Sequence, residues 1–286
     1  MTVAHTYVTN PSLLQALERS YSREIVVSPT RGSGFITRDQ QSVGVCANSS
    51  CVCSFVPPDP GWPTEKELVA AAVRHLRAPT QRDSLVLEEF RTSFGLPDIL
   101  HLCYDVGKLT DRMSTSSRTR NPITRDAARL LSLISRQGPL GERDGARRLG
   151  FATTRFRAAA DLLIARRLAD SEGEATRICH EDSSFFLNRV AVYEAKLKAW
   201  SKAIVQAQRH LWFADEALIL MPALSDKIRS RLIPACATAG IGLATLESDG
   251  LRTVFKAEPN EVPRSWLTWY LNELVFDVRC LDADAV

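Results

Sequence analysis

Apolar side chains recur at regular spacing along most of the chain, and the spacing predicts alternating helices and strands. A helix is predicted over about 65–77, with Thr64 as its N-cap, because the apolar residues there fall on one stripe of period 3.6: Leu68, Val69, Ala72, Val73 and Leu76. Two apolar runs follow at 84–90 and 96–104, joined by a short polar turn, and we predict a strand in each.

The last third of the chain continues this alternation. A β-rich run near 185–195 passes straight into a helix, a short buried strand follows at 217–222, and another helix is predicted over about 226–239. Two strands around the Asp249–Gly250 turn and a final helix near Trp266 complete the pattern. Such alternation predicts an α/β fold in which a mixed sheet is flanked by helices.

Residues 108–183, between these two regions, have a different pattern. A polar linker leads into a predicted helix over 124–136, which is followed by a short helix over about 142–149 and a third helix over 153–167. A hairpin with a tight Glu-Gly turn is predicted over 168–178. This order is typical of a winged helix-turn-helix, and it resembles the winged-helix modules common in bacterial regulators.

The composition is that of a folded protein with a sizeable core: 286 residues, 45% hydrophobic and 24% charged. The N-terminus has no basic start followed by an apolar stretch, and no apolar run approaches the roughly 20 residues of a membrane span. The seven cysteines are an odd number without regular spacing, so we expect reduced thiols and a cytoplasmic location.

Residues 1–60 are predicted to form an N-terminal α+β extension, with a helix around 12–23 followed by strand-like pieces. Three cysteines cluster in it: Cys46, Cys51 and Cys53. A zinc site completed by a fourth ligand is one interpretation, but structural zinc sites more often pair their cysteines as CxxC. Ordinary thiols are therefore the favoured interpretation, and no function is assigned to this extension.

Positive charge is concentrated in the predicted winged module. The chain carries a formal net charge of +3, whereas the segment from Arg118 to Arg167 holds twelve arginines against four carboxylates, a net charge of +8. The rest of the chain therefore sums to −5. A compact basic module in an otherwise acidic protein favours a polyanionic partner, and a solvated helical face is the alternative.

The third helix of the module is the element expected to enter the major groove of double-stranded DNA. Its first residues are candidates to reach bases or phosphates: Thr153, Thr154, Arg155 and Arg157. Arg147 and Arg148, on the preceding helix, are candidates for contacts with backbone phosphates. A winged helix can instead mediate dimerisation or bind protein, and the basic charge favours DNA.

Two short motifs outside the module carry candidate chemistry. Pro97-Asp98 lies in the second predicted strand, and Glu194-Ala195-Lys196 lies in the β-rich run after the module. Residues two apart in a strand share a face, so Glu194 and Lys196 are expected to project together, which is costly to bury without partners. An aspartate from a neighbouring strand would complete a carboxylate pair able to hold Mg²⁺ or Mn²⁺ for phosphodiester hydrolysis.

The segments FGLPDIL and VAVYEAKLKAWSKAIVQAQ resemble the PD-(D/E)xK nuclease superfamily, which has an aspartate on the second core strand and Glu-x-Lys on the third. The resemblance covers about residues 64–106 and 184–257. It implies metal-dependent hydrolysis of DNA, with Asp98 and Glu194 as metal ligands and Lys196 beside the attacking water.

The resemblance also implies two contributors from helices. The first core helix often supplies a further glutamate, and Glu65 lies on the inward stripe whereas Glu67 points away. The helix after the third strand often carries a glutamine, for which Gln206 is the candidate and Gln208 the alternative.

The motifs are unusually far apart, with nearly a hundred residues between Asp98 and Glu194. An inserted domain whose ends lie close together accounts for this distance. We therefore predict a discontinuous restriction-endonuclease-like core, residues 61–107 and 184–286, interrupted by a winged helix-turn-helix at 108–183. The site requires that the two motif-bearing strands be neighbours.

Two function classes follow. The first is a metal-dependent DNA endonuclease, in restriction of foreign DNA or in repair, for which a homodimer is expected because cutting both strands needs two active sites. The second is a DNA-binding transcriptional regulator whose nuclease-like domain is catalytically silent and serves dimerisation or sensing. The intact set of Asp98, Glu194 and Lys196 favours the enzyme.

Overall fold

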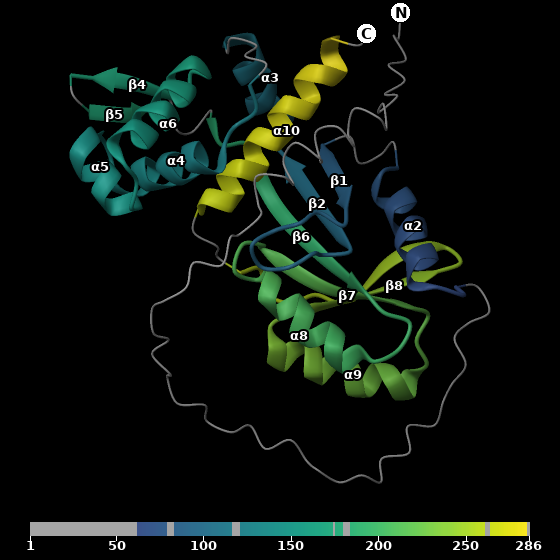
Figure 1. The fold of residues 1–286 in the computed structure, drawn as a ribbon. Helices are drawn as coiled ribbons and strands as arrows, with labels where there is room; N and C mark the ends of the chain where they lie inside the picture. Colours follow the sequence, from purple (N-terminus) through teal and green to yellow (C-terminus); the bar gives the residue numbers. More distant parts are fainter. Residues whose placement is uncertain are drawn as a thin grey trace, which may run out of the picture.

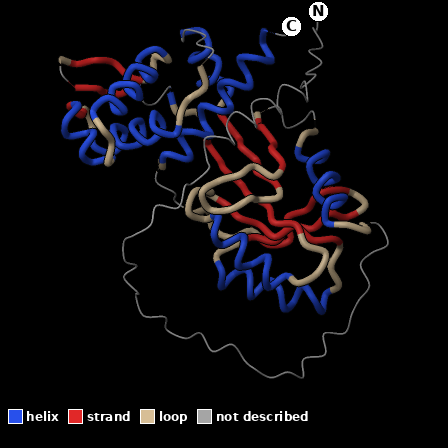
Figure 2. The backbone as a smooth tube through the Cα atoms, in the orientation of Figure 1, coloured by secondary structure: helices blue, strands red, loops and turns tan. Residues whose placement is uncertain are grey.

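The protein folds as a mixed α/β structure around a six-stranded mixed sheet of order β1-β2-β6-β7-β8-β9 (Figures 1 and 2). The computed structural model describes residues 62–78, 83–115, 121–173, 175–179, 184–260 and 264–284. The elements predicted within 1–60, and the cysteine cluster there, lie outside the described residues. None of the described helices is long and apolar enough to cross a membrane. The predicted mixed sheet flanked by helices is confirmed.

The sheet has an antiparallel and a parallel part. The antiparallel part is made of the three strands β1 (Ser84–Glu88), β2 (Ile99–Tyr104) and β6 (Leu187–Ala195). The parallel part joins β6 to β7 (Glu216–Pro222) and β8 (Gly242–Glu247). The edge strand β9 (Gly250–Phe255) pairs antiparallel with β8.

Helices cover both faces of this sheet (Figure 1). One face packs against α2 (Glu65–Leu76), and Leu218 and Leu220 of β7 point to that side. The other face packs against α8 (Trp200–His210) and α9 (Asp226–Ala239). Ala217 and Ile219 of β7 point to this second side, as the alternation of side chains along a strand requires.

Residues 121–178 form a separate group of elements, shown apart from the sheet in Figure 1. It contains the three helices α4 (Arg125–Gln137), α5 (Glu142–Leu149) and α6 (Thr153–Ala165). A three-stranded sheet of order β3-β5-β4 completes it, formed by β3 (Leu140–Gly141), β4 (Ala169–Glu172) and β5 (Ala175–Ile178). The preceding helix, α3 (Val106–Thr115), was not predicted from the sequence, because few of its residues are apolar.

The C-terminal helix α10 (Trp266–Asp284) lies between this group and the central sheet (Figure 1). One hydrophobic cluster runs from β2 through α10 into α4 and α6. Glu273 of α10 is fully buried and binds two arginines, Arg112 of α3 and Arg166 just after α6. Its carboxylate accepts from Arg112 Nη2 at 2.6 Å and from Arg166 Nη2 at 2.8 Å, so α10 joins both sides of the inserted segment.

Replacing this buried carboxylate is expected to destabilise the protein strongly. Burial alone would raise the pKa of Glu273, but Arg112 and Arg166 outweigh burial and lower it from 4.5 to about 2. Glu273→Gln removes the carboxylate charge between two buried guanidinium groups, of which Arg166 keeps its pair with Asp277, so urea titration at pH 7 should show a loss of about 3–5 kcal/mol in the free energy of unfolding.

The matched control is Glu88→Gln, because Glu88 forms a half-exposed pair with Arg77 and should contribute about 0–1 kcal/mol. The contribution of Glu273 is present above the unfolded-state pKa and is lost as pH falls from about 4.5 towards 2. A loss no larger than that of the control at pH 7 would contradict the role given to Glu273.

Candidate active site

The pairing of β2 with β6 brings the two predicted motifs side by side. Ile99 is opposite Tyr193 in the antiparallel ladder, and Asp98 immediately precedes Ile99. The backbone N–H of Ala195 donates to Oδ2 of Asp98 at 2.7 Å. The strand begins at Ile99, so Pro97 and Asp98 precede it instead of lying within it as predicted. The two motif-bearing strands are neighbours, as the site requires.

Lys196 follows the last residue of β6, and its ammonium lies among oxygen atoms. Nζ donates to the carbonyl oxygen of Ala195 at 2.7 Å and to Oε2 of Glu65 at 3.1 Å. Oδ2 of Asp98 lies 4.0 Å from Nζ. Three oxygens from three elements therefore surround one cation at this end of the sheet.

The first turn of α2 places Glu65 at this cluster. Thr64 is the N-cap of α2, and its side chain accepts from the backbone N–H of Glu67. The carboxylate of Glu67 turns back to the backbone N–H of Thr64, completing a capping box. Glu65 is left facing Lys196, and one of the two glutamates therefore caps the helix while the other reaches the site.

Glu194 has a partner that the sequence did not reveal. It is 2% exposed, and its Oε1 lies 2.7 Å from Nε2 of His210 at the end of α8. The imidazole is enclosed by Phe213 and by Gly95, where an added Cβ would lie 3.2 Å from Cε1 of His210. An ionised Glu194 accepts from Nε2, which leaves Nδ1 of His210 buried without a partner among the described residues.

Glu194 and Lys196 do not share their contacts, which differs from the sequence-based expectation. Glu194 is bound by His210 of α8, whereas Lys196 is bound by Glu65 of α2, and α2 and α8 cover opposite faces of the sheet. The reason is local, because Lys196 lies beyond Ala195, where β6 ends and the alternation of a strand no longer applies.

The electrostatic environment of Asp98 is that of a crowded, half-buried acid. Burial raises the pKa of Asp98 from 3.8 to about 6. The Ala195 N–H and the Lys196 ammonium act in the opposite direction, while the carboxylates of Glu194 and Glu65 raise the pKa further. A carboxyl group whose ionisation is disfavoured by neighbouring carboxylates is typical of sites that gain from a bound cation.

The residues present fit a magnesium ion of low protein coordination. Among the described residues, no group of three or more His, Cys, Asp or Glu side chains gathers to hold a metal. Asp98 and Glu194 would supply two carboxylates, and the Ala195 carbonyl would supply a third hard oxygen. Mg²⁺ usually keeps several waters and binds through one or two carboxylates, so this donor set is sufficient.

The glutamines of α8 do not join this set. Gln206 is exposed and forms no hydrogen bond with Asp98, Glu194 or Lys196. Gln208 donates from Nε2 to the carbonyl oxygen of Ala239 at 3.2 Å, which ties α8 to α9. The structure therefore places neither glutamine where the resemblance implied.

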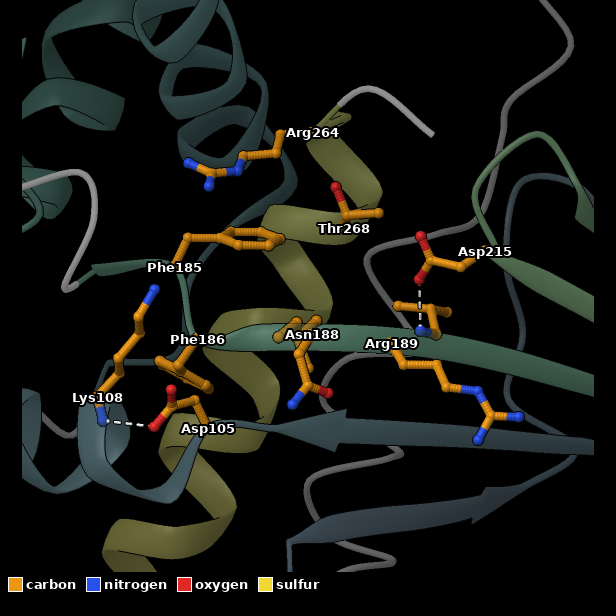
Figure 3. A pocket seen from close by; sticks show the side chains of 11 residues that line it. Asp105, Lys108, Phe185, Phe186, Asn188, Arg189, Asp215, Arg264 and Thr268 are labelled. Atoms are coloured by element: carbon orange, nitrogen blue, oxygen red, sulfur yellow. Dashed lines mark hydrogen bonds between the residues drawn. The ribbon is translucent and has the colours of Figure 1, made fainter. Parts of the chain in front are cut away.

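A cavity of about 280 Å³ lies at the other end of β6 (Figure 3). Lys108, Phe185 and Arg264 line it, and the Arg264 guanidinium lies 4.6 Å from the centre of the Phe185 ring. The part of β6 that lines this cavity is 187–190, whereas the carboxylate cluster is at residues 194–196. The carboxylate cluster thus lies at the opposite end of β6 and is separate from this cavity.

The arginines predicted to contact DNA are exposed, and each pairs with a carboxylate of its own segment. The ion pairs are Arg147 and Arg148 with Asp144, Arg155 with Asp126, and Arg157 with Glu142. Thr153 and Thr154 are exposed at the start of α6. A phosphate that approaches these arginines would have to share them with the carboxylates.

No protein-family model, curated protein or solved structure matches the chain.

Because the pKa of Asp98 is raised, replacing Asp98 with a neutral residue should increase the thermal stability of the metal-free protein, and the increase should depend on pH. Ionising Asp98 in the metal-free folded protein costs free energy, and this cost grows as pH rises from about 4 through about 6. Asp98→Asn retains an oxygen for the Ala195 N–H and removes the charge. Thermal melts in EDTA should show a higher Tm for the variant at pH 8, and a smaller difference at pH 4. An equal difference at both pH values would contradict this account.

Proposed function

We propose that this protein is a divalent-metal-dependent DNA nuclease of the PD-(D/E)xK type. The observation that carries the proposal is the neighbouring position of Asp98 and the Glu194-Ala195-Lys196 segment, although an inserted group of elements separates them in the chain. The order of helix, two strands, third strand and helix resembles the superfamily pattern, with Glu-x-Lys at the end of the third strand and the aspartate one residue before the second strand instead of on it.

In this proposal each residue has a defined task. The metal ion would be held by Asp98, Glu194 and the Ala195 carbonyl. When bound, such an ion polarises a phosphate and lowers the pKa of a water molecule. Lys196 lies beside these oxygens and orients the attacking water, and Glu65 holds Lys196 in place. At neutral pH Asp98 is ionised, because its pKa of about 6 lies below the working pH.

We further propose that the segment from α4 to β5 is a winged helix-turn-helix that binds double-stranded DNA. Its order of helix, short strand, two helices and hairpin supports this, as does the pairing order β3-β5-β4. In this proposal α6 is the recognition helix, presenting Thr153 and Thr154. Two copies of the chain would be needed to cut both strands of a duplex, so a homodimer is part of the proposal.

A second candidate is a DNA-binding regulator with a catalytically silent core. The observation that favours it is the enclosure of Glu194, which is buried and already bound by His210. A carboxylate held in this way must exchange or share its partner before it binds a metal. The half-buried Asp98, whose carboxylate lies 4.0 Å from the Lys196 ammonium, favours the nuclease.

Cleavage assays distinguish the two candidates. Linear, supercoiled and single-stranded DNA are incubated with the purified protein and Mg²⁺, Mn²⁺ or EDTA. We expect metal-dependent cleavage that Glu194→Ala abolishes, because one of the two proposed carboxylate ligands is lost. Gln206→Ala is the matched control on the adjacent helix, and it should retain cleavage because Gln206 is exposed and bonds to none of the site residues.

Absence of cleavage with every substrate and metal, together with tight duplex binding, would favour the regulator. Cleavage that Glu194→Ala leaves unchanged would remove the proposed mechanism.

A further inference from the structure

The solvent-exposed side of α8 carries a stripe of basic and apolar side chains. Three of its members are spaced three or four residues apart on one face of α8, and the fourth lies in the turn just after the helix: Lys202, Val205, Arg209 and Trp212. Trp212 is 74% exposed and Val205 is 51% exposed. This set is called the α8 stripe below. An exposed tryptophan beside unpaired cations is unusual on a surface with no partner.

The cations of the α8 stripe differ from those of the inserted segment. Lys202 and Arg209 are exposed, and within the described part of the chain neither forms an ion pair. The helix Trp200–His210 contains no aspartate or glutamate. The predicted DNA-contacting arginines, in contrast, are each paired with a carboxylate. The α8 stripe therefore presents positive charge that is available to an external anion.

The C-terminal end of the α8 stripe lies nearest the proposed active site. Trp212 is two residues from His210, which is bound to Glu194. The neighbouring Phe213 stacks on Phe94 in the loop that leads to Asp98. At its other end, α8 begins at Trp200, four residues after Lys196. A ligand bound at Arg209 and Trp212, which flank His210 in the chain, would thus lie near the carboxylate cluster.

We propose that the α8 stripe is the surface that holds double-stranded DNA against the active site, an inference that rests on the proposed nuclease function. Lys202 and Arg209 are seven residues apart, about 10.5 Å along a helix axis. The two cations contact backbone phosphates, and Trp212, which lies beyond Arg209, packs against the sugar and base edges next to them.

Salt dependence of binding tests the cationic part of the proposal. Duplex affinity is measured by fluorescence anisotropy at several salt concentrations, in a Glu194→Ala background that leaves the DNA intact. Each phosphate contact contributes a log–log slope of about −0.9, so Lys202→Ala/Arg209→Ala should make the slope shallower by about 1.8. The matched control is Lys227→Ala/Arg231→Ala, an exposed lysine and arginine on α9, and it should leave the slope unchanged.

Tryptophan fluorescence tests the aromatic part. Addition of duplex should quench the emission of the protein, and Trp212→Phe should remove most of that quenching. Because Trp212 is exposed, this replacement should leave the urea midpoint of unfolding of the protein unchanged. An unaltered slope in the double variant, or an equal change in the α9 control, would overturn the role of the α8 stripe. Quenching that persists in Trp212→Phe would overturn the contact with Trp212.

The outcomes separate this inference from the proposed function. If the double variant loses salt-dependent binding and the unmodified protein never cuts DNA, the α8 stripe stands and the nuclease fails. If the protein cuts DNA and the double variant binds with an unaltered slope, the nuclease stands and the α8 stripe fails. A protein that binds no duplex at all would overturn both.

Discussion

The antiparallel pairing of β2 with β6 is the constraint on which the proposed site depends. The strands pair from Ile99 with Tyr193 to Tyr104 with Leu187, so residues 105–186 must fold between them. Closing so long a connection costs little more entropy than closing a shorter one, because the cost grows only with the logarithm of its length. A compact insertion can therefore separate Asp98 from Glu194 in the chain while the ladder keeps them together.

Buried charge holds the insertion to this sheet. Glu273 of α10 binds Arg112 in the first helix of the insertion and Arg166 just after α6. The preceding residue, Asn272, accepts from the backbone N–H groups of Phe186 and Leu187, where the chain enters β6. One helical turn of α10 thus fixes both ends of the insertion and the start of the strand that carries Glu194. Because of these bonds, a displacement of the insertion would also shift the start of β6.

The sequence predicted those features that depend on local pattern. The helix over 226–239 has the predicted bounds, and Thr64 caps its helix as expected. The motif also indicated which carboxylates approach one another. The partner of Glu194 was missed, because His210 reaches Glu194 only after α8 packs its inward face against the sheet. The pairing of Arg155 with Asp126 was missed for the same reason, since it joins two helices that only the tertiary fold brings together.

The most direct test of the central claim is Mn²⁺ binding followed by electron paramagnetic resonance, because it asks whether the β2–β6 pairing assembles a cation site. The account predicts that the unmodified protein binds Mn²⁺ and that Asp98→Asn and Glu194→Gln, one from each strand, both weaken binding severely. Glu216→Gln, a carboxylate change on β7 beside Arg189, serves as the control and should bind Mn²⁺ normally. Binding that is equal in all four proteins, or undetectable in the unmodified one, would contradict the account.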